Sequence, residues 1–130
     1  MAQSQNDSWL QAQEQIRRGE YVQSIPVLQK ILETDSTQVE AALQLGFVQQ
    51  RLGQLPAARK TYETVLRRDT SQIEALNQLA ILSEKNAQYR RALHYYQRLI
   101  GRYTQRSGFL IIFRNEGSFN WFRVVTIIDV

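Results

Sequence analysis

The sequence predicts an all-α fold, an α-solenoid built from tandem pairs of helices. The main observation is a period of about 34 residues in the order of turn, apolar and small residues, which is typical of a helix–turn–helix repeat array. In the middle of the chain the order is Gly53, Leu55, Ala58, Tyr62 and Val65. It recurs one period earlier at Gly19, Tyr21, Ser24, Leu28 and Ile31, and one period later at Asn86-Ala87, Tyr89, Ala92, Tyr96 and Leu99.

A second periodic feature is a small residue inside the first helix of each unit. Ala12, Gly46 and Ala80 follow one another at intervals of one period. A glycine within a helix costs about 1 kcal/mol relative to alanine, so Gly46 indicates the close approach of a neighbouring helix. We therefore expect one tight helix–helix crossing to recur in every unit.

The composition excludes several classes of site. The 130 residues are enough for one small domain with a modest core. The absence of cysteine excludes disulfides, zinc–thiolate sites and thiol nucleophiles, and the single histidine, His94, excludes multi-histidine metal sites. No apolar run reaches the ~18 residues of a membrane-spanning helix. The N-terminus shows no signal peptide, which favours a cytoplasmic location, although a periplasmic protein with its leader removed would begin in the same way.

The net charge of +4 rises along the chain. Residues 1–38 hold 3 basic and 5 acidic residues (−2), residues 39–72 hold 5 and 3 (+2), residues 73–106 hold 6 and 2 (+4), and residues 107–130 hold 2 and 2 (zero). Two interpretations stay open. The gradient either steers an acidic partner towards the third unit, or reflects solvated helix faces with arginines near helix C-termini.

The first unit is predicted over residues 5–38. Its first helix ends at Arg17-Arg18-Gly19, where cations in the last turn are followed by a glycine. Its second helix contains Pro26, which leaves two alternatives. Either Ser24 caps a late start, or the helix begins near Tyr21 and bends at the proline.

The second and third units, residues 39–72 and 73–106, begin with the same pattern. Thr37-Gln-Val-Glu40 and Ser71-Gln-Ile-Glu74 both fit a capping box. In such a box the hydroxyl accepts a hydrogen bond from one free N–H of the helix, and the glutamate reaches back to another. We therefore expect both first helices to be capped by these hydroxyl groups.

The last stretch, residues 107–130, does not continue the period. Phe109–Phe113 and Trp121–Ile128 are rich in β-branched and aromatic residues and flank a turn-forming segment, so the local pattern predicts a β-hairpin. Because an isolated hairpin is only marginally stable, we expect this apolar tail to pack on the third unit, to pair with another chain or to remain poorly ordered. A helical conformation and a non-native extension are the alternatives.

Residues 5–106 resemble three tetratricopeptide repeats. The resemblance rests on Leu45-Gly46 and Leu79-Ala80 in the first helices, together with the periodic turn, apolar, small and large residues. It implies a right-handed superhelix of antiparallel helix pairs, whose first helices line a concave groove that binds peptides or helices of partner proteins. Where the family has a closing proline, this chain has hydroxyl residues that can cap instead, at Ser36, Thr70 and Thr104.

The resemblance places candidate peptide-binding residues on the three first helices. They are Trp9, Gln13 and Arg17 in the first, Gln44, Phe47, Gln50 and Arg51 in the second, and Asn77, Gln78, Ile81 and Lys85 in the third. The basic and asparagine residues with which some members hold a C-terminal carboxylate are absent. Apolar anchors among amides instead suit an extended or amphipathic peptide. For Leu43 and Ile81, packing between repeats is an equal alternative.

The sequence contains no set of catalytic residues. It has no glycine-rich phosphate loop, no HExxH and no nucleophile–base pair. We therefore predict a non-enzymatic protein-interaction scaffold without cofactor or metal, whose partner is a peptide or helix segment of another protein. The alternative is a scaffold that self-associates through the repeat ends and residues 107–130. The helical spacing of Tyr62 and Tyr96 favours core packing over stacking on nucleic acid, so a nucleic-acid partner is disfavoured.

Overall fold

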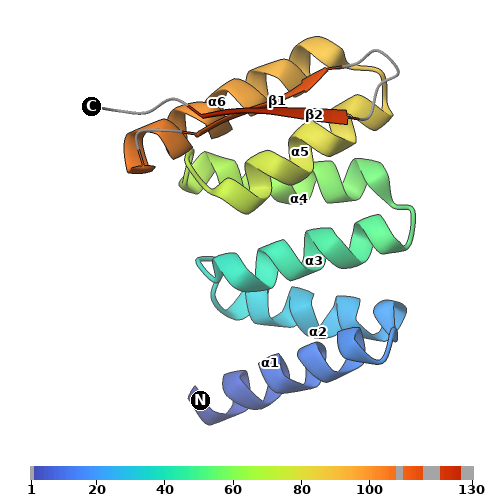
Figure 1. Cartoon of the computed structure of the whole chain (residues 1–130). Helices are drawn as coiled ribbons and strands as arrows, with labels where there is room; N and C mark the ends of the chain where they lie inside the picture. Colours follow the sequence, from blue (N-terminus) through green and yellow to red (C-terminus); the bar gives the residue numbers. More distant parts are fainter. Residues whose placement is uncertain (1, 108–109, 116–120, 127–130) are drawn as a thin grey trace. The chain divides into compact units, whose positions relative to one another are not determined.

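The computed structural model describes residues 2–107, 110–115 and 121–126 (Figure 1). Within these residues, six α-helices are followed by two β-strands. The helices are α1 (Ala2–Arg17), α2 (Tyr21–Thr34), α3 (Val39–Arg51), α4 (Leu55–Arg68), α5 (Ile73–Lys85) and α6 (Tyr89–Ser107), and the strands are β1 (Leu110–Asn115) and β2 (Trp121–Thr126).

The chain forms two compact units. In the first, Met1–Arg68, α1 packs on α2, α2 on α3 and α3 on α4. In the second, Asp69–Val130, α5 packs on α6, and β1 also contacts α6. Consecutive helices within each unit run in opposite directions (Figure 1). The predicted all-α class built from antiparallel helix pairs is therefore confirmed.

The two strands lie in the stretch for which the sequence predicts a hairpin. They pair in antiparallel fashion, beginning with Leu110 opposite Thr126. The predicted turn, residues 116–120, and the strand residues Phe109 and 127–128 lie outside the described residues.

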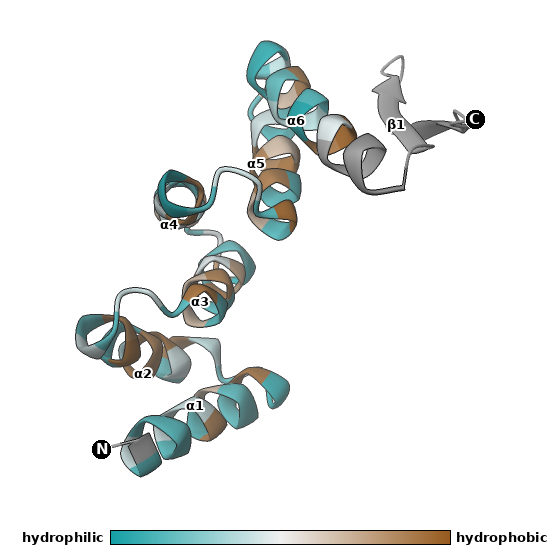
Figure 2. Cartoon of the chain, turned by 90° about the vertical axis from the view of Figure 1, so that its left-hand side faces the viewer, coloured by the Kyte–Doolittle hydropathy of each residue, from teal (hydrophilic) through white to brown (hydrophobic). Residues whose placement is uncertain are grey.

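Each unit has its own core of small and branched side chains. Figure 2 shows hydrophobic segments on α2 and α3, which together supply Leu28, Ile31, Ala41, Leu45 and Val48 to one core cluster of the first unit. The small residues Ala12 and Ala80 are fully buried, as a recurring tight crossing requires. The first unit buries Ala12, Leu28, Ile31, Ala41, Leu43, Leu45, Val48, Ala58, Tyr62, Val65 and Leu66, and the second unit buries Ala75, Leu76, Leu79, Ala80, Leu82, Ala92, Tyr95, Tyr96 and Leu99.

Gly46 of α3 lies directly against the ring of Tyr62 in α4. A Cβ atom added to Gly46 would be 2.6 Å from Cζ and 2.7 Å from Cε1 of that ring. The ring is held in place because Tyr62 is 1% exposed and because its hydroxyl donates to Oε1 of Gln50 at 2.8 Å. The prediction that Gly46 marks the close approach of a neighbouring helix is confirmed.

The first helix of every pair ends in the same left-handed turn. Gly19 and Gly53 have φ of +79° and +77°, and the residue one period later, Ala87, has φ of +56°. After the second of these turns, the N–H of Gln54 donates to the carbonyl of Gln49 at 2.8 Å, the long hydrogen bond of a Schellman motif. The third turn was predicted at Asn86-Ala87, and of these two residues Ala87 takes the left-handed conformation, whereas Asn86 has φ of −98°.

The two predicted capping boxes do not form. Thr37 donates its N–H and its hydroxyl to Oδ1 of Asp35, at 3.0 and 2.5 Å. Ser71 donates in the same way to Oδ1 of Asp69, at 3.0 and 2.8 Å. In each loop the hydroxyl group is therefore hydrogen-bonded to the aspartate two residues earlier and does not cap the helix. The N-cap is the next residue in each case, and at Gln72 the amide side chain accepts from the helix instead.

Arginines of the second helices hold the same two loops. The guanidinium of Arg68 donates to the carbonyl of Ser36 and, at 3.0 Å, to its hydroxyl. Arg98 donates to the carbonyl of Thr70. Neither Ser36 nor Thr70 caps the next helix, so that expectation is wrong. The hydrogen bonds from the loop lower the pKa of the Asp35 carboxyl, with a smaller contribution from the charge of Arg68.

The structure also decides between the two alternatives for Pro26. Helix α2 begins at Tyr21 and contains the proline. Ser24 is buried, and its hydroxyl donates to the carbonyl of Tyr21 at 2.8 Å. A late start capped by Ser24 is therefore wrong, because this hydroxyl acts within the first turn of a helix that has already begun.

Candidate functional site

The predicted binding residues lie on α1, α3 and α5, and each is exposed or half-buried. A side chain that contacts a partner has to be accessible, so all of them meet this condition. Leu43 does not, because it is 9% exposed and belongs to the core. In the first unit these residues are Trp9, Gln13, Arg17, Gln44, Phe47, Gln50 and Arg51, and in the second Asn77, Gln78, Ile81 and Lys85.

Three side chains of the first unit form an aromatic cluster, which consists of Tyr21, Phe47 and Arg51. The rings of Tyr21 and Phe47 meet edge to face, with centroids 6.2 Å apart and an interplanar angle of 81°. Cζ of the Arg51 guanidinium lies 5.8 Å from the centroid of the Tyr21 ring. Phe47 remains 39% exposed. The cluster therefore presents the ring of Phe47 beside the positive charge of Arg51, and both side chains lie against the ring of Tyr21.

The sequence predicted Phe47 and Arg51 but assigned Tyr21 only to packing. The helix order contains a signal that could have found it. Helix α2 begins where α1 ends, and α3 runs in the same direction as α1 (Figure 1). The first residue of α2 is therefore brought to the last turn of α3, where Phe47 and Arg51 lie one turn apart.

Arg17, the predicted cation of α1, is paired with an acid on its own helix. Its Nη2 and Nε lie 2.6 and 2.8 Å from the carboxylate oxygens of Glu14. Arg18 adds a contact of 2.7 Å to the same carboxylate. The hydrogen bond from Arg17, with a smaller one from Arg18, lowers the pKa of Glu14 to about 2. Part of the charge that Arg17 offers to a ligand is thus offset locally, whereas Arg51 lies over a ring.

Two of the predicted amides have their orientation fixed by hydrogen bonds. Oε1 of Gln50 accepts from the Tyr62 hydroxyl at 2.8 Å. Nε2 of Gln78 donates to Oε1 of Glu74 at 2.8 Å. The NH2 group of Gln50 and the carbonyl oxygen of Gln78 retain further hydrogen-bonding capacity of the kind that peptide backbone satisfies.

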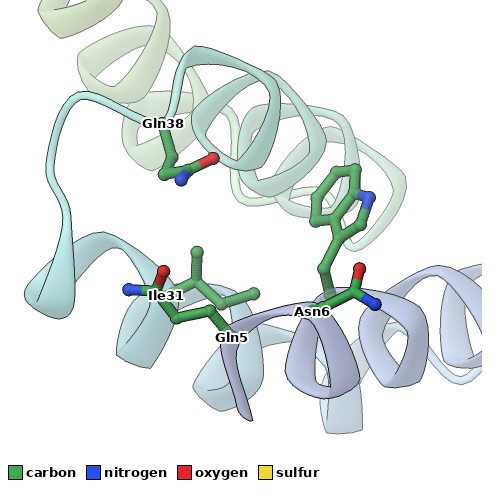
Figure 3. A pocket seen from close by; sticks show the side chains of 5 residues that line it. Gln5, Asn6, Ile31 and Gln38 are labelled. Atoms are coloured by element: carbon green, nitrogen blue, oxygen red, sulfur yellow. The ribbon is translucent and has the colours of Figure 1, made fainter. Parts of the chain in front are cut away.

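A cavity of about 210 Å³ lies beside the N-terminal half of α1. Gln5, Asn6 and Trp9 of α1 line it together with Ile31 of α2 and Gln38 before α3. Figure 3 shows Gln38 opposite Ile31 and Gln5 across this space. The wall contains three amides, an indole and an aliphatic side chain and no charged group, so it suits an uncharged occupant.

Only Trp9 of the cavity wall was predicted from the sequence. Asn6 could have been found, because it precedes Trp9 by three residues and shares its helix face. Gln38 could not, because its place depends on how the loop between α2 and α3 returns to the start of α1.

The described part of the chain has no group of three or more histidine, aspartate or glutamate side chains placed to hold a metal ion. No helix in it is both long enough and apolar enough to cross a membrane. His94 is exposed on α6, with its ring 5.9 Å from that of Tyr95. Tyr62 and Tyr96 are buried, as the core-packing interpretation predicts.

The sequence profile of the tetratricopeptide repeat family matches residues 15–82, more than half of the 130-residue chain. The chain belongs to the tetratricopeptide repeat (TPR) family. The fold of this TPR protein is that of a protein-interaction scaffold. No curated protein matches it significantly in sequence.

Several solved structures are similar to this TPR protein. SycD of Yersinia enterocolitica, a type III secretion translocator chaperone, gives a TM-score of 0.74 at 18% identity, over 83% of this chain and 82% of SycD. MamA gives a TM-score of 0.76 at 16% identity, over 80% of this chain and 61% of MamA. YrrB, a TPR protein with an unusual peptide-binding site, gives a TM-score of 0.70 at 17% identity, over 78% of this chain and 53% of YrrB. The likeness shows the fold alone, and this chain spans less than two thirds of MamA and YrrB.

Proposed function

We propose that this TPR protein is a non-enzymatic scaffold that binds a peptide or helix segment of a partner protein on the first helices of three repeats, residues 5–38, 39–72 and 73–106. The exposed Phe47 of the aromatic cluster is the observation that carries the proposal. A large ring held by packing offers contact area with little loss of conformational freedom, which is typical of interface hot spots. The proposed contact residues are the eleven predicted ones, with Tyr21 as their support.

The cluster favours a segment with an apolar or aromatic anchor. Such a side chain packs against Phe47, while Arg51 attracts a backbone carbonyl or an acidic group next to the anchor. The cavity beside Trp9 accepts a second, uncharged side chain, because Gln5, Asn6 and Gln38 can hydrogen-bond to backbone or amide groups but cannot neutralise a charge. Apolar anchors then supply affinity, and amides fix the backbone.

The similar structures support a protein segment as the ligand class. One is described as a translocator chaperone and another as having a peptide-binding site. The proposal rests on the side chains of this chain, because sequence identities of 17–18% carry only the fold.

The test uses peptides selected for binding to the intact protein from a random display library. Replacing Phe47 and Arg51 together by alanine should weaken these peptides by about tenfold or more, as expected for hot-spot side chains. Helical circular dichroism should not change, since both side chains are exposed.

The matched control is Lys60→Ala with Arg67→Ala, which removes two exposed side chains of α4. This control should bind like the wild type. Unchanged peptide affinity in the Phe47 and Arg51 variant would show that the first helices are not the binding face.

A further inference from the structure

A stripe of apolar side chains runs along α6, and its first two members are open to solvent. Tyr89 is 65% and Leu93 57% exposed, although β1 also contacts this helix. Ile100 is half-buried. The three residues are spaced by four and seven positions, which places them on one side of a helix. We call Tyr89, Leu93 and Ile100 the α6 stripe.

The repeat register shows what such a stripe does elsewhere in the chain. Two periods earlier, Tyr21, Ile25 and Leu32 occupy the same positions on α2. There they are half-buried against the core of the first unit. The residues of α3 in that core form a stripe of their own, the α3 stripe, which consists of Ala41, Leu45 and Val48. Helix α2 packs on α3, and Tyr21 of this stripe meets Phe47 of α3. The stripe on α2 thus contributes to the surface on which the next first helix packs.

The charge of α6 limits the kind of helix that can cover it. Residues 89–107 contain five arginines and no acidic residue. Arg90 and Arg91, next to Tyr89, are exposed. A covering helix with acidic side chains would be attracted to this surface, and a basic one would be repelled.

We propose that the α6 stripe binds an acidic amphipathic helix of a partner protein, which packs on α6 as α3 packs on α2. The bound helix would present apolar residues at i, i+4 and i+7, the spacing of the α3 stripe. This site lies on a second helix, so it is separate from the face proposed above and would let the scaffold hold two partner segments.

A second copy of this chain fits the stripe poorly. Two α6 helices packed face to face would oppose their arginines. Helix α1 of another copy is more acidic, but the counterparts of the α3 stripe, one period earlier, are Asp7, Gln11 and Glu14. A polar row of this kind cannot replace three apolar side chains, so an external helix is the better occupant.

The test uses the full chain and a synthetic peptide of residues 37–53 carrying Gln44→Glu and Arg51→Glu. These changes make the peptide acidic and keep the α3 stripe. Titrated into the isotope-labelled protein, the peptide should shift the backbone amide signals of the α6 stripe. Leu93→Asp should weaken binding at least tenfold, and Arg90→Glu should weaken it by removing the attraction. Both side chains are exposed, so the fold should persist.

The matched control is Val22→Asp, which adds the same charge at a residue of α2 that is 65% exposed. It should leave binding unchanged. No shift on α6 at millimolar peptide, or shifts confined to α2 where the peptide replaces α3, would overturn the proposal. Self-association that is lost in Leu93→Asp would assign the stripe to a second copy. Binding of phosphatidylserine vesicles through Leu93, without binding of the peptide, would assign it to a membrane surface.

Discussion

The contact between Gly46 and Tyr62 depends on the absence of one methyl group. The ring occupies the space in which a Cβ atom would lie, at 2.6 Å from Cζ. It cannot turn away without breaking the hydrogen bond to Gln50 and exposing its apolar surface. At this point a residue that weakens a helix is required for two helices to meet.

Gly46→Ala should therefore destabilise the protein, although alanine is the better helix former. The gain in helix propensity is about 1 kcal/mol, and overpacking of a filled core costs about 1–3 kcal/mol. We expect a lower midpoint in urea unfolding followed by circular dichroism. Gly101→Ala is the control, because its added Cβ meets nothing within 4 Å. An unchanged midpoint for Gly46→Ala would mean that the ring of Tyr62 moves freely.

The pKa of the Glu14 carboxyl should reflect its pairing with Arg17 and Arg18. Its pKa is lowered to about 2 from an ordinary 4.5, first by the hydrogen bond from Arg17. A lowered pKa in the folded state means that the stabilisation is present above pH 4.5 and is lost as the pH falls towards 2. The effect on unfolding should be small, because the pair is exposed and screened by solvent.

The measurement is an NMR titration of the Glu14 side chain. The wild type should titrate near pH 2, and Arg17→Ala should move the midpoint towards 4.5. Added salt should move it in the same direction, because screening weakens the charge interaction. A wild-type midpoint near 4.5 would show that the pairing does not persist in solution.

At the scale of the element, the ends of the helices are where this chain departs from regularity. Two of the three first helices end at a glycine with positive φ, but the third ends at Ala87 with φ of +56°. A left-handed conformation costs a residue with a Cβ atom roughly 1–2 kcal/mol. The turn after α5 is therefore strained where the equivalent turns are not.

Ala87→Gly should relieve this strain and stabilise the protein. The expected gain is about 0.5–1 kcal/mol, less than the full cost, because glycine also gives the unfolded chain more freedom. Thermal unfolding should show a higher midpoint. Gly53→Ala, the reverse change at the equivalent turn, should lower it. Equal midpoints for wild type and Ala87→Gly would show that the turn tolerates alanine without strain.

The sequence predicted the helices well because their positions follow a period. Gly46 and the buried small residues one period before and after it could be identified without coordinates. The capping of α3 and α5 could not, because Thr37 and Ser71 belong to two overlapping patterns. Each hydroxyl can cap the following helix or donate to the preceding aspartate, and local sequence does not decide between them. In the structure each hydroxyl donates to the preceding aspartate.

The candidate site divides in the same way. Phe47 and Arg51 were predicted because the family resemblance places the groove on the first helices, and both residues lie on such a helix. Tyr21 and Gln38 were missed because their contribution depends on the path between helices. Residues whose role is set by their own helix are readable from sequence, and residues brought in from a neighbouring element are not.

At the scale of the whole molecule, polarity differs between the first and the last helix of the described sequence. Helix α1 carries Asp7, Gln11 and Glu14 where α3 has core residues. In contrast, α6 exposes Tyr89 and Leu93 where the corresponding residues of α2 are covered. In repeat proteins each unit is stabilised by its neighbours, and a terminal unit needs a polar outer face. The face of α1 is polar in this way, and the exposed apolar face of α6 is the one that we propose for a partner helix.

The cavity beside α1 also gives the protein its own optical reporter. Trp9 forms part of the wall and is half-buried, so its indole borders both the cavity and solvent. The chain has only two tryptophans. In a Trp121→Phe background the tryptophan fluorescence would come from Trp9 alone. Any occupant that displaces water from the cavity wall would shift the emission maximum of Trp9. Unlabelled peptides could then be ranked by fluorescence before any partner is known.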